Sequence, residues 1–91
     1  MSKKSYSSWL EEFTKGKREV PSSPTSDQFG IRSLRRYVDA QDHIWETAIT
    51  YTGRLVLRHG RLDADGISIE WEPWVTEHDI EVPTHLNTLL N

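Results

Sequence analysis

The chain contains no cysteine among its 91 residues. Disulfide bridges and thiolate metal sites are therefore excluded, and a reducing compartment is compatible with the composition. No run approaches the roughly 18 consecutive apolar residues that a membrane-spanning helix needs. The opening residues, MSKKSYSS, are basic but lack the apolar segment of a secretory signal. We therefore expect a soluble, cytoplasmic protein that makes no membrane contact.

Sequence signatures of catalysis are also missing. There is no GxSxG segment in which a serine could be activated, no P-loop and no GxGxxG fingerprint. The four histidines are spread along the chain without HExxH spacing: His43, His59, His78 and His85. A chain of 91 residues also has little room for a deep pocket. We therefore expect a non-enzymatic protein without a cofactor or a metal ion.

One short acidic segment, Asp63-Ala64-Asp65-Gly66, has the spacing of the start of a calcium-binding loop. Such a loop needs a bidentate glutamate at its twelfth position, and that position is occupied by Trp74. Glycine after aspartate is typical of a tight hairpin turn instead. The segment therefore predicts a turn between two strands.

Aromatic residues are abundant: the nine of them, including four tryptophans, supply much of the area that a core can bury. The stretch from Ile44 to Trp74 consists of three runs rich in β-branched and aromatic residues, separated by glycine-containing turn signals such as Thr52-Gly53. A period of two places one set of side chains on a core and the other in water. The period is clearest in the third run, where Ile67, Ile69 and Trp71 alternate with Ser68, Glu70 and Glu72. This stretch predicts an antiparallel meander of three strands.

A helical stripe precedes the meander near the N-terminus. Its apolar members have the spacing i, i+3, i+4 and i+7 of one helix face: Tyr6, Trp9, Leu10 and Phe13. Ser5 is a suitable N-cap, and Gly16 lies where a C-cap glycine is common. We predict a helix over residues 5–15 and expect residues 1–4 to be frayed.

The next segment, residues 16–27, contains two prolines and three serines and predicts a mobile loop. A second helix is predicted over residues 27–41, because Ile31, Leu34 and Val38 form a helical stripe behind capping residues. The next residues, 44–52, are open to two interpretations, a first strand of the meander or a continuation of this helix. We favour the strand, because the β-branched residues near its end lose rotamer freedom in a helix.

After the meander, Pro73 ends the third strand or confines it to a sheet edge. Residues 78–82 form a short strand candidate that could pair with a second copy, and residues 84–91 a final helical turn. We expect one small α+β domain over residues 1–91, with two N-terminal helices packed on an antiparallel meander of three to four strands. The oligomeric state stays open. The expected core residues are Trp9, Leu10, Phe13, Ile31, Leu34, Val38, Trp45, Ile49, Leu55, Leu57, Ile67, Ile69 and Trp71.

The charges are unevenly distributed along the chain. Residues 1–36 carry eight Lys/Arg against four Asp/Glu, whereas residues 63–91 carry seven Asp/Glu and no Lys/Arg. Such a split indicates either one basic and one acidic surface or two halves that pair internally. Of these two interpretations, we favour internal pairing.

Binding to a protein partner is the function that we expect, as a regulator, an inhibitor or an accessory subunit of a larger complex. Tryptophan is enriched at interface hot spots, and Trp74 is left outside the core if Trp71 is buried. The acidic residues around it would meet a basic surface of the partner. The predicted contact residues are Trp74, Glu70, Glu72, Glu77 and Asp79.

The alternative is a nucleic-acid-binding accessory protein. Arginines of the predicted second helix could lie on phosphates, together with cations of the preceding loop. The residues concerned are Arg32, Arg35, Arg36, Lys17 and Arg18. The acidic C-terminal third would repel a polyanion unless it faced away, so this function ranks second.

Overall fold

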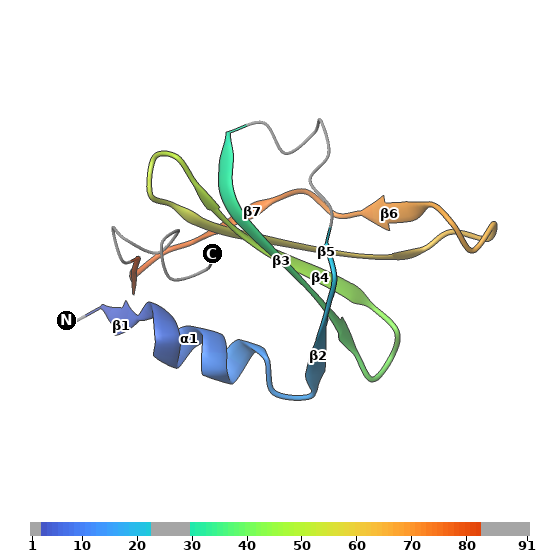
Figure 1. Cartoon of the computed structure of the whole chain (residues 1–91), viewed down its shortest axis with the longest axis horizontal. Coiled ribbons are helices and arrows are strands. Elements are labelled where there is room, and N and C mark those ends of the chain that lie inside the picture. Colours follow the sequence, from blue (N-terminus) through green and yellow to red (C-terminus); the bar gives the residue numbers. More distant parts are fainter. Residues whose placement is uncertain (1–2, 23–29, 83–91) are drawn as a thin grey trace.

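The computed structural model describes residues 3–22 and 30–82, and this part of the chain is mostly β-structure with one helix (Figure 1). Within it, no helix has the length and apolar character needed to cross a membrane. The elements are β1 (Lys4–Ser5), α1 (Tyr6–Phe13), β2 (Lys17–Val20), β3 (Ile31–Asp39), β4 (Ile44–Thr50), β5 (Leu55–Leu62), β6 (Ile69–Trp71), β7 (Val75–Glu77) and β8 (Ile80–Glu81).

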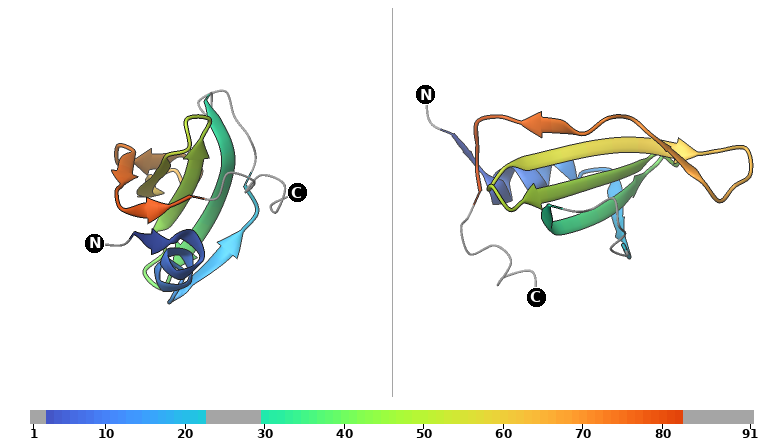
Figure 2. Two further views of the ribbon diagram at one scale, coloured as in Figure 1. Left: turned by 90° about the vertical axis from the view of Figure 1, so that its left-hand side faces the viewer. Right: turned by 90° about the horizontal axis from the view of Figure 1, so that it is seen from above.

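Six of these strands form one antiparallel sheet. Strands β2 to β6 lie side by side in sequence order. Strands β6 and β7 share one edge of β5: β7 pairs with the beginning of β5, and β6 pairs with its end. Strands β1 and β8 form a separate parallel pair of two residues each. The helix α1 lies against one side of the twisted sheet, as Figures 1 and 2 show.

The register divides the strand residues into two faces, because direct partners in antiparallel strands project to the same side. We call the side that contacts α1 the helix face. We call the opposite side the arginine face, because it carries Arg18, Arg36 and Arg58 on three different strands.

An aromatic row holds α1 on the helix face. Ser5 caps the helix by accepting a hydrogen bond from the backbone N–H of Ser8 (3.2 Å). The rings of Trp9 and Phe13 are stacked at 5.0 Å, and Phe13 meets the ring of Tyr37 edge-on at 5.6 Å. The predicted N-terminal helix is therefore confirmed, and its apolar stripe contacts the sheet.

The centre of the core lies between α1 and strands β4 and β5. Tyr6, Ile49 and Leu55 are buried there. The partly buried apolar residues packed against them are Trp9, Leu10, Ile80 and Val82. Ile67, which we predicted in the core, is 83% exposed, because β6 begins only at Ile69 and leaves Ile67 in the preceding turn.

The predicted second helix is wrong, since residues 31–39 form β3 between β2 and β4. The predicted fold of two helices on a three- to four-stranded meander is therefore corrected to one described helix on a six-stranded sheet. Leu34 and Val38 are four residues apart, a spacing that fits one helix face and, being even, also one strand face. Tyr37 distinguishes the strand from the helix. It lies on the strand face opposite to Leu34 and Val38 and is buried there against α1.

Other predictions had mixed outcomes. Ile44–Thr50 form β4, so the predicted strand is confirmed and the helical continuation is wrong. Lys17–Val20, which we expected in a loop, form the edge strand β2. The predicted strand at 78–82 is reduced to β8, which pairs with β1 of the same chain. The predicted helical turn at 84–91 lies outside the described residues.

Tyr37 should make the stability of the fold sensitive to alkaline pH. Burial raises the pKa of its phenol to about 12, and the nearby charge of Arg35 offsets this only in part. The unfolded chain ionises the phenol near pH 10, so the folded state holds the proton more tightly. The stability that depends on neutral Tyr37 is therefore fully present below about pH 10 and is lost as the pH rises to about 12.

Urea unfolding measured across this alkaline window tests the prediction. The Tyr37→Phe variant cannot ionise at this position, so its stability should fall less steeply than that of the wild type. An equal fall in both proteins would show that other groups cause the alkaline transition.

Candidate functional site

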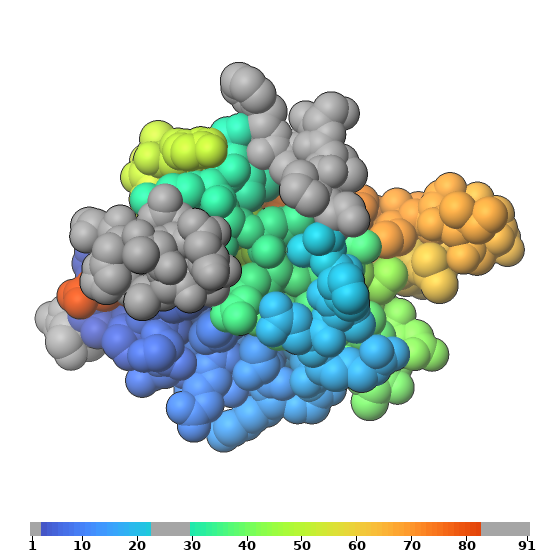
Figure 3. Space-filling view, in the orientation of Figure 1, coloured from blue at the N-terminus to red at the C-terminus, as the bar shows by residue number. Residues whose placement is uncertain are grey.

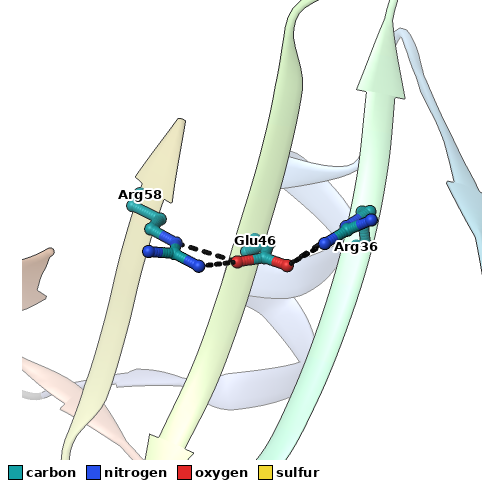
Figure 4. A network of polar contacts seen from close by, with 3 residues as sticks. All are labelled: Arg36, Glu46 and Arg58. Carbon is teal, nitrogen blue, oxygen red and sulfur yellow. Dashed lines mark hydrogen bonds and ion pairs between the residues drawn. The ribbon is translucent and has the colours of Figure 1, made fainter. Parts of the chain in front are cut away.

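The centre of the arginine face holds one carboxylate between two guanidinium groups (Figure 4). Glu46 of β4 lies between Arg36 of β3 and Arg58 of β5, because the register pairs it with both. Arg36 donates from Nε (3.1 Å) and Nη2 (2.8 Å) to Oε2 of Glu46. Arg58 contacts Oε1 through Nε and Nη2, each at 2.8 Å. Glu46 is fully buried, whereas the side chains of Arg36 and Arg58 are 27% and 11% exposed.

Two indole rings complete this group of residues. The guanidinium carbon of Arg58 lies 4.1 Å from the ring centroid of Trp71 and 4.4 Å from that of Trp74. The guanidinium carbon of Arg36 lies 5.8 Å from the ring of Trp71. These separations are within the range of cation–π attraction. We call the five residues the arginine cluster: Arg36, Glu46, Arg58, Trp71 and Trp74.

A proline accounts for the position of Trp74. Pro73 lies between β6 and β7 and has no N–H to donate to the ladder, so pairing along β5 is interrupted there. The backbone N–H of Glu72 still donates to the carbonyl of His59 (2.8 Å). The interruption therefore lies beside Arg58, and Trp74 contacts that side chain. The predicted end of the third strand at Pro73 is confirmed.

A groove of about 370 Å³ lies where the β5–β6 hairpin leaves the body of the protein. The hairpin projects from the sheet and is drawn in orange tones in Figures 1 and 3. The rings of Trp45 and His59, which are direct partners on the helix face, lie 4.7 Å apart and form an aromatic wall. We call this site the acidic groove; its lining residues are His43, Trp45, His59, Gly60, Arg61, Glu70 and Glu72.

The aromatic wall is held in place by Asp39. The indole Nε1–H of Trp45 donates to Oδ2 of Asp39 (2.9 Å), while Oδ1 accepts from the backbone N–H groups of Gln41 and His43 (2.9 Å each). The hydrogen bond from Trp45 is the main reason that the pKa of Asp39 lies below its usual value, and the two backbone donors lower it further. The indole is therefore fixed before any ligand arrives.

The two carboxylates of the groove are unpartnered in the described part of the chain. Neither Glu70 nor Glu72 has a side-chain hydrogen bond or ion pair with residues 3–22 or 30–82. Arg61 lies opposite Glu70 in the register but forms no ion pair with it. Both carboxylates are thus available to an incoming cation.

The five predicted partner-contact residues do not form a single surface. Glu70 and Glu72 both line the acidic groove. Trp74 instead contacts Arg58 in the arginine cluster. Glu77 belongs to β7 and Asp79 follows it, whereas the groove lies beside β6. Because β6 and β7 pair with opposite ends of β5, the two ends of this edge are separated by roughly 20 Å.

The arginines predicted for nucleic-acid binding lie on a strand and are divided between its two faces. On the helix face, Nε of Arg35 lies 3.2 Å from a carboxylate oxygen of Glu19. On the arginine face, Arg36 contacts Glu46. Their partners are therefore glutamates outside the acidic segment 63–91, so the predicted pairing of the basic and acidic parts does not account for these arginines.

The remaining predicted cations are separated as well. Nζ of Lys17 donates to the carbonyl of Phe13 (2.7 Å) and lies over its ring. Arg18 is exposed on the arginine face of β2. Nε of Arg32 is buried without a hydrogen-bond partner among the described residues. The predicted basic helix is therefore absent as a binding surface.

Sequence reasoning missed the residues at the centres of these two sites. These residues become neighbours only through the strand register, which pairs Glu46 with Arg58 and Trp45 with His59. Among residues 3–22 and 30–82, no group of three His, Asp or Glu side chains is arranged to hold a metal ion. Comparisons with protein-family models, curated proteins and solved structures found no match.

Proposed function

We propose that this protein is a small non-enzymatic module that binds a protein partner through the acidic groove, as a regulatory or accessory subunit. The observation that supports this proposal best is the pair of unpartnered carboxylates, Glu70 and Glu72, beside a fixed aromatic wall. Protein interfaces combine aromatic contact area with complementary charge. The groove offers both at one end of the sheet.

The charge of the groove favours a lysine or arginine of the partner. Among the described residues that line the groove, there are two carboxylates and a single guanidinium group, that of Arg61. An entering cation could form charge-assisted hydrogen bonds with the carboxylates and contact the indole of Trp45. The Nζ of Lys17 already lies 5.0 Å from the centroid of this ring. The two carboxylates, rather than the ring, therefore supply the attraction for a basic side chain of the partner.

The rigidity of the aromatic wall supports binding of a partner in the groove. The hydrogen bond from Trp45 to Asp39 keeps the wall in one orientation, which reduces the ordering cost of association.

Capture of partners from cells of the native host tests the proposal. The tagged full chain should recover a specific partner, and the Glu70→Gln/Glu72→Gln variant should recover at least about tenfold less of it. This estimate assumes that loss of charge-assisted contacts weakens binding by at least 1.4 kcal/mol. Quantitative mass spectrometry after nuclease treatment provides the measurement.

A matched control removes two carboxylates elsewhere. Glu11 on α1 and Glu81 on β8 are exposed and lie outside the groove, so Glu11→Gln/Glu81→Gln should recover the partner as the wild type does. Equal recovery with both double variants would eliminate the groove as the contact surface. Absence of any specific partner of the wild type would contradict protein binding altogether.

A further inference from the structure

On the arginine face, the positive charge of Arg36 is only partly neutralised by the neighbouring side chains. Glu46 divides its single negative charge between the guanidinium groups of Arg36 and Arg58. Arg36 therefore shares the only counter-charge that it contacts in the described part of the chain. Its side chain is 27% exposed, so this charge is screened less than that of a fully solvated arginine.

Arg36 also has hydrogen-bond donors to spare. A guanidinium group carries five N–H donors in a planar arrangement. One from Nε and one from Nη2 point to the same oxygen of Glu46. The donors on the outer edge, including those of Nη1, have no acceptor among residues 3–22 and 30–82. In the described part of the chain, Nε of Arg32 is the buried side-chain atom without a hydrogen-bond partner, so the spare donors of Arg36 are accessible to an acceptor from solvent.

A second arginine lies diagonally across from this edge. The direct partner of Arg36 on β2 is Val20, and Arg18 is two residues along the same face. Diagonal neighbours of this kind are separated by about 7–8 Å, within reach of long side chains. Arg18 is exposed and has no partner in the described part of the chain. The two guanidinium groups can therefore converge on one ligand above Val20.

We propose that Arg36 and Arg18 together bind a phosphate group on the arginine face. A phosphate monoester carries a charge of about −1.5 to −2 at neutral pH and three acceptor oxygens, which matches two guanidinium groups. The planar fork of arginine also fits phosphate oxygens in a bidentate manner. The site is on the opposite face from the acidic groove, so it does not depend on the proposed protein contact.

Titration of the full chain with inorganic phosphate, followed by NMR of the arginine Nε–H groups, tests the site. Sodium chloride keeps the ionic strength constant. The Arg36 signal should shift and saturate. Arg18→Gln should weaken phosphate binding about tenfold, the loss expected from one charge-assisted hydrogen bond. Because Arg18 is exposed on an edge strand, this variant should fold normally.

Arg54→Gln is the matched control, since Arg54 is exposed in the turn between β4 and β5 and its loss changes the net charge equally. This variant should bind phosphate as the wild type does. Equal weakening in both variants, or a shift that never saturates, would reveal general charge attraction and overturn the proposal. Acetate tests the ligand class. It should bind at least about tenfold more weakly, because it carries less charge and fewer acceptor oxygens than phosphate, and equal affinity would overturn the assignment to phosphate.

Discussion

Replacing Glu46 by alanine is expected to lower the free energy of unfolding by about 3–5 kcal/mol. The side chain of Glu46 is fully buried and contacts both arginines of the cluster. Its removal leaves two guanidinium groups on either side of an empty position with no carboxylate between them. Because Arg58 is only 11% exposed, water can compensate this charge only in part. Small domains are stable by roughly 5–15 kcal/mol, so the loss should be large in proportion.

Urea unfolding followed by tryptophan fluorescence measures this loss, and two further variants separate its causes. Glu46→Gln keeps the shape of the side chain and removes only its charge. The additional destabilisation of Glu46→Ala relative to Glu46→Gln therefore measures the cost of the cavity. Replacing Arg36, Glu46 and Arg58 together by leucine removes all the charges, and it should be far less destabilising than Glu46→Ala. A loss below about 1 kcal/mol in Glu46→Ala would contradict the importance of the carboxylate at the centre of the sheet.

Local sequence patterns predicted the elements in which a single periodicity dominates. The N-terminal stripe from Tyr6 to Phe13 can be accommodated only by a helix, and Ser5 caps it as expected. The alternation that ends at Trp71 likewise identified strand β6. In these two segments the burial pattern agrees with the intrinsic preferences of the residues, so local information was sufficient. Strand β4 was favoured over a helix only by its β-branched residues, and it is buried on both faces.

The β3 segment could not be assigned in this way, because the spacing of Leu34 and Val38 fits both a helix and a strand. The assignment depends on contacts with distant parts of the chain. Tyr37 is buried by Phe13 of α1, and Arg36 contacts Glu46 of β4. Neither contact is visible in the local sequence.

The arginine cluster forms only if the strand register is correct to within one residue. The β4–β5 hairpin is centred on Thr52, which places Glu46 opposite Arg58. A turn centred between Thr52 and Gly53, as the sequence signal indicates, would shift the pairing by one residue and put these side chains on different faces. The turn could thus be located from the sequence, while the charged contact across it could not.

Gly60→Ala is expected to destabilise the protein near the upper end of the roughly 1–3 kcal/mol that overpacking usually costs. A Cβ atom at Gly60 would overlap the backbone carbonyl oxygen of Glu70 and lie 2.9 Å from Cε3 of Trp71 and 3.0 Å from Cγ2 of Ile69. The backbone of Gly60 needs no unusual conformation, so the cost comes from contact alone. Strand β6 would have to move away from β5, and urea unfolding would measure the loss.

A double-mutant cycle identifies which contact causes this loss. Trp71→Ala removes the ring that the new methyl group meets, but it leaves the carbonyl of Glu70 in place. A side chain can rotate away, whereas this carbonyl is held by the strand, so Trp71→Ala should not rescue Gly60→Ala. Full rescue would assign the clash to the indole instead. Wild-type stability of Gly60→Ala would contradict the close packing of β6 on β5, and with it the fixed positions of both Trp71 over Arg58 and Glu70 in the acidic groove.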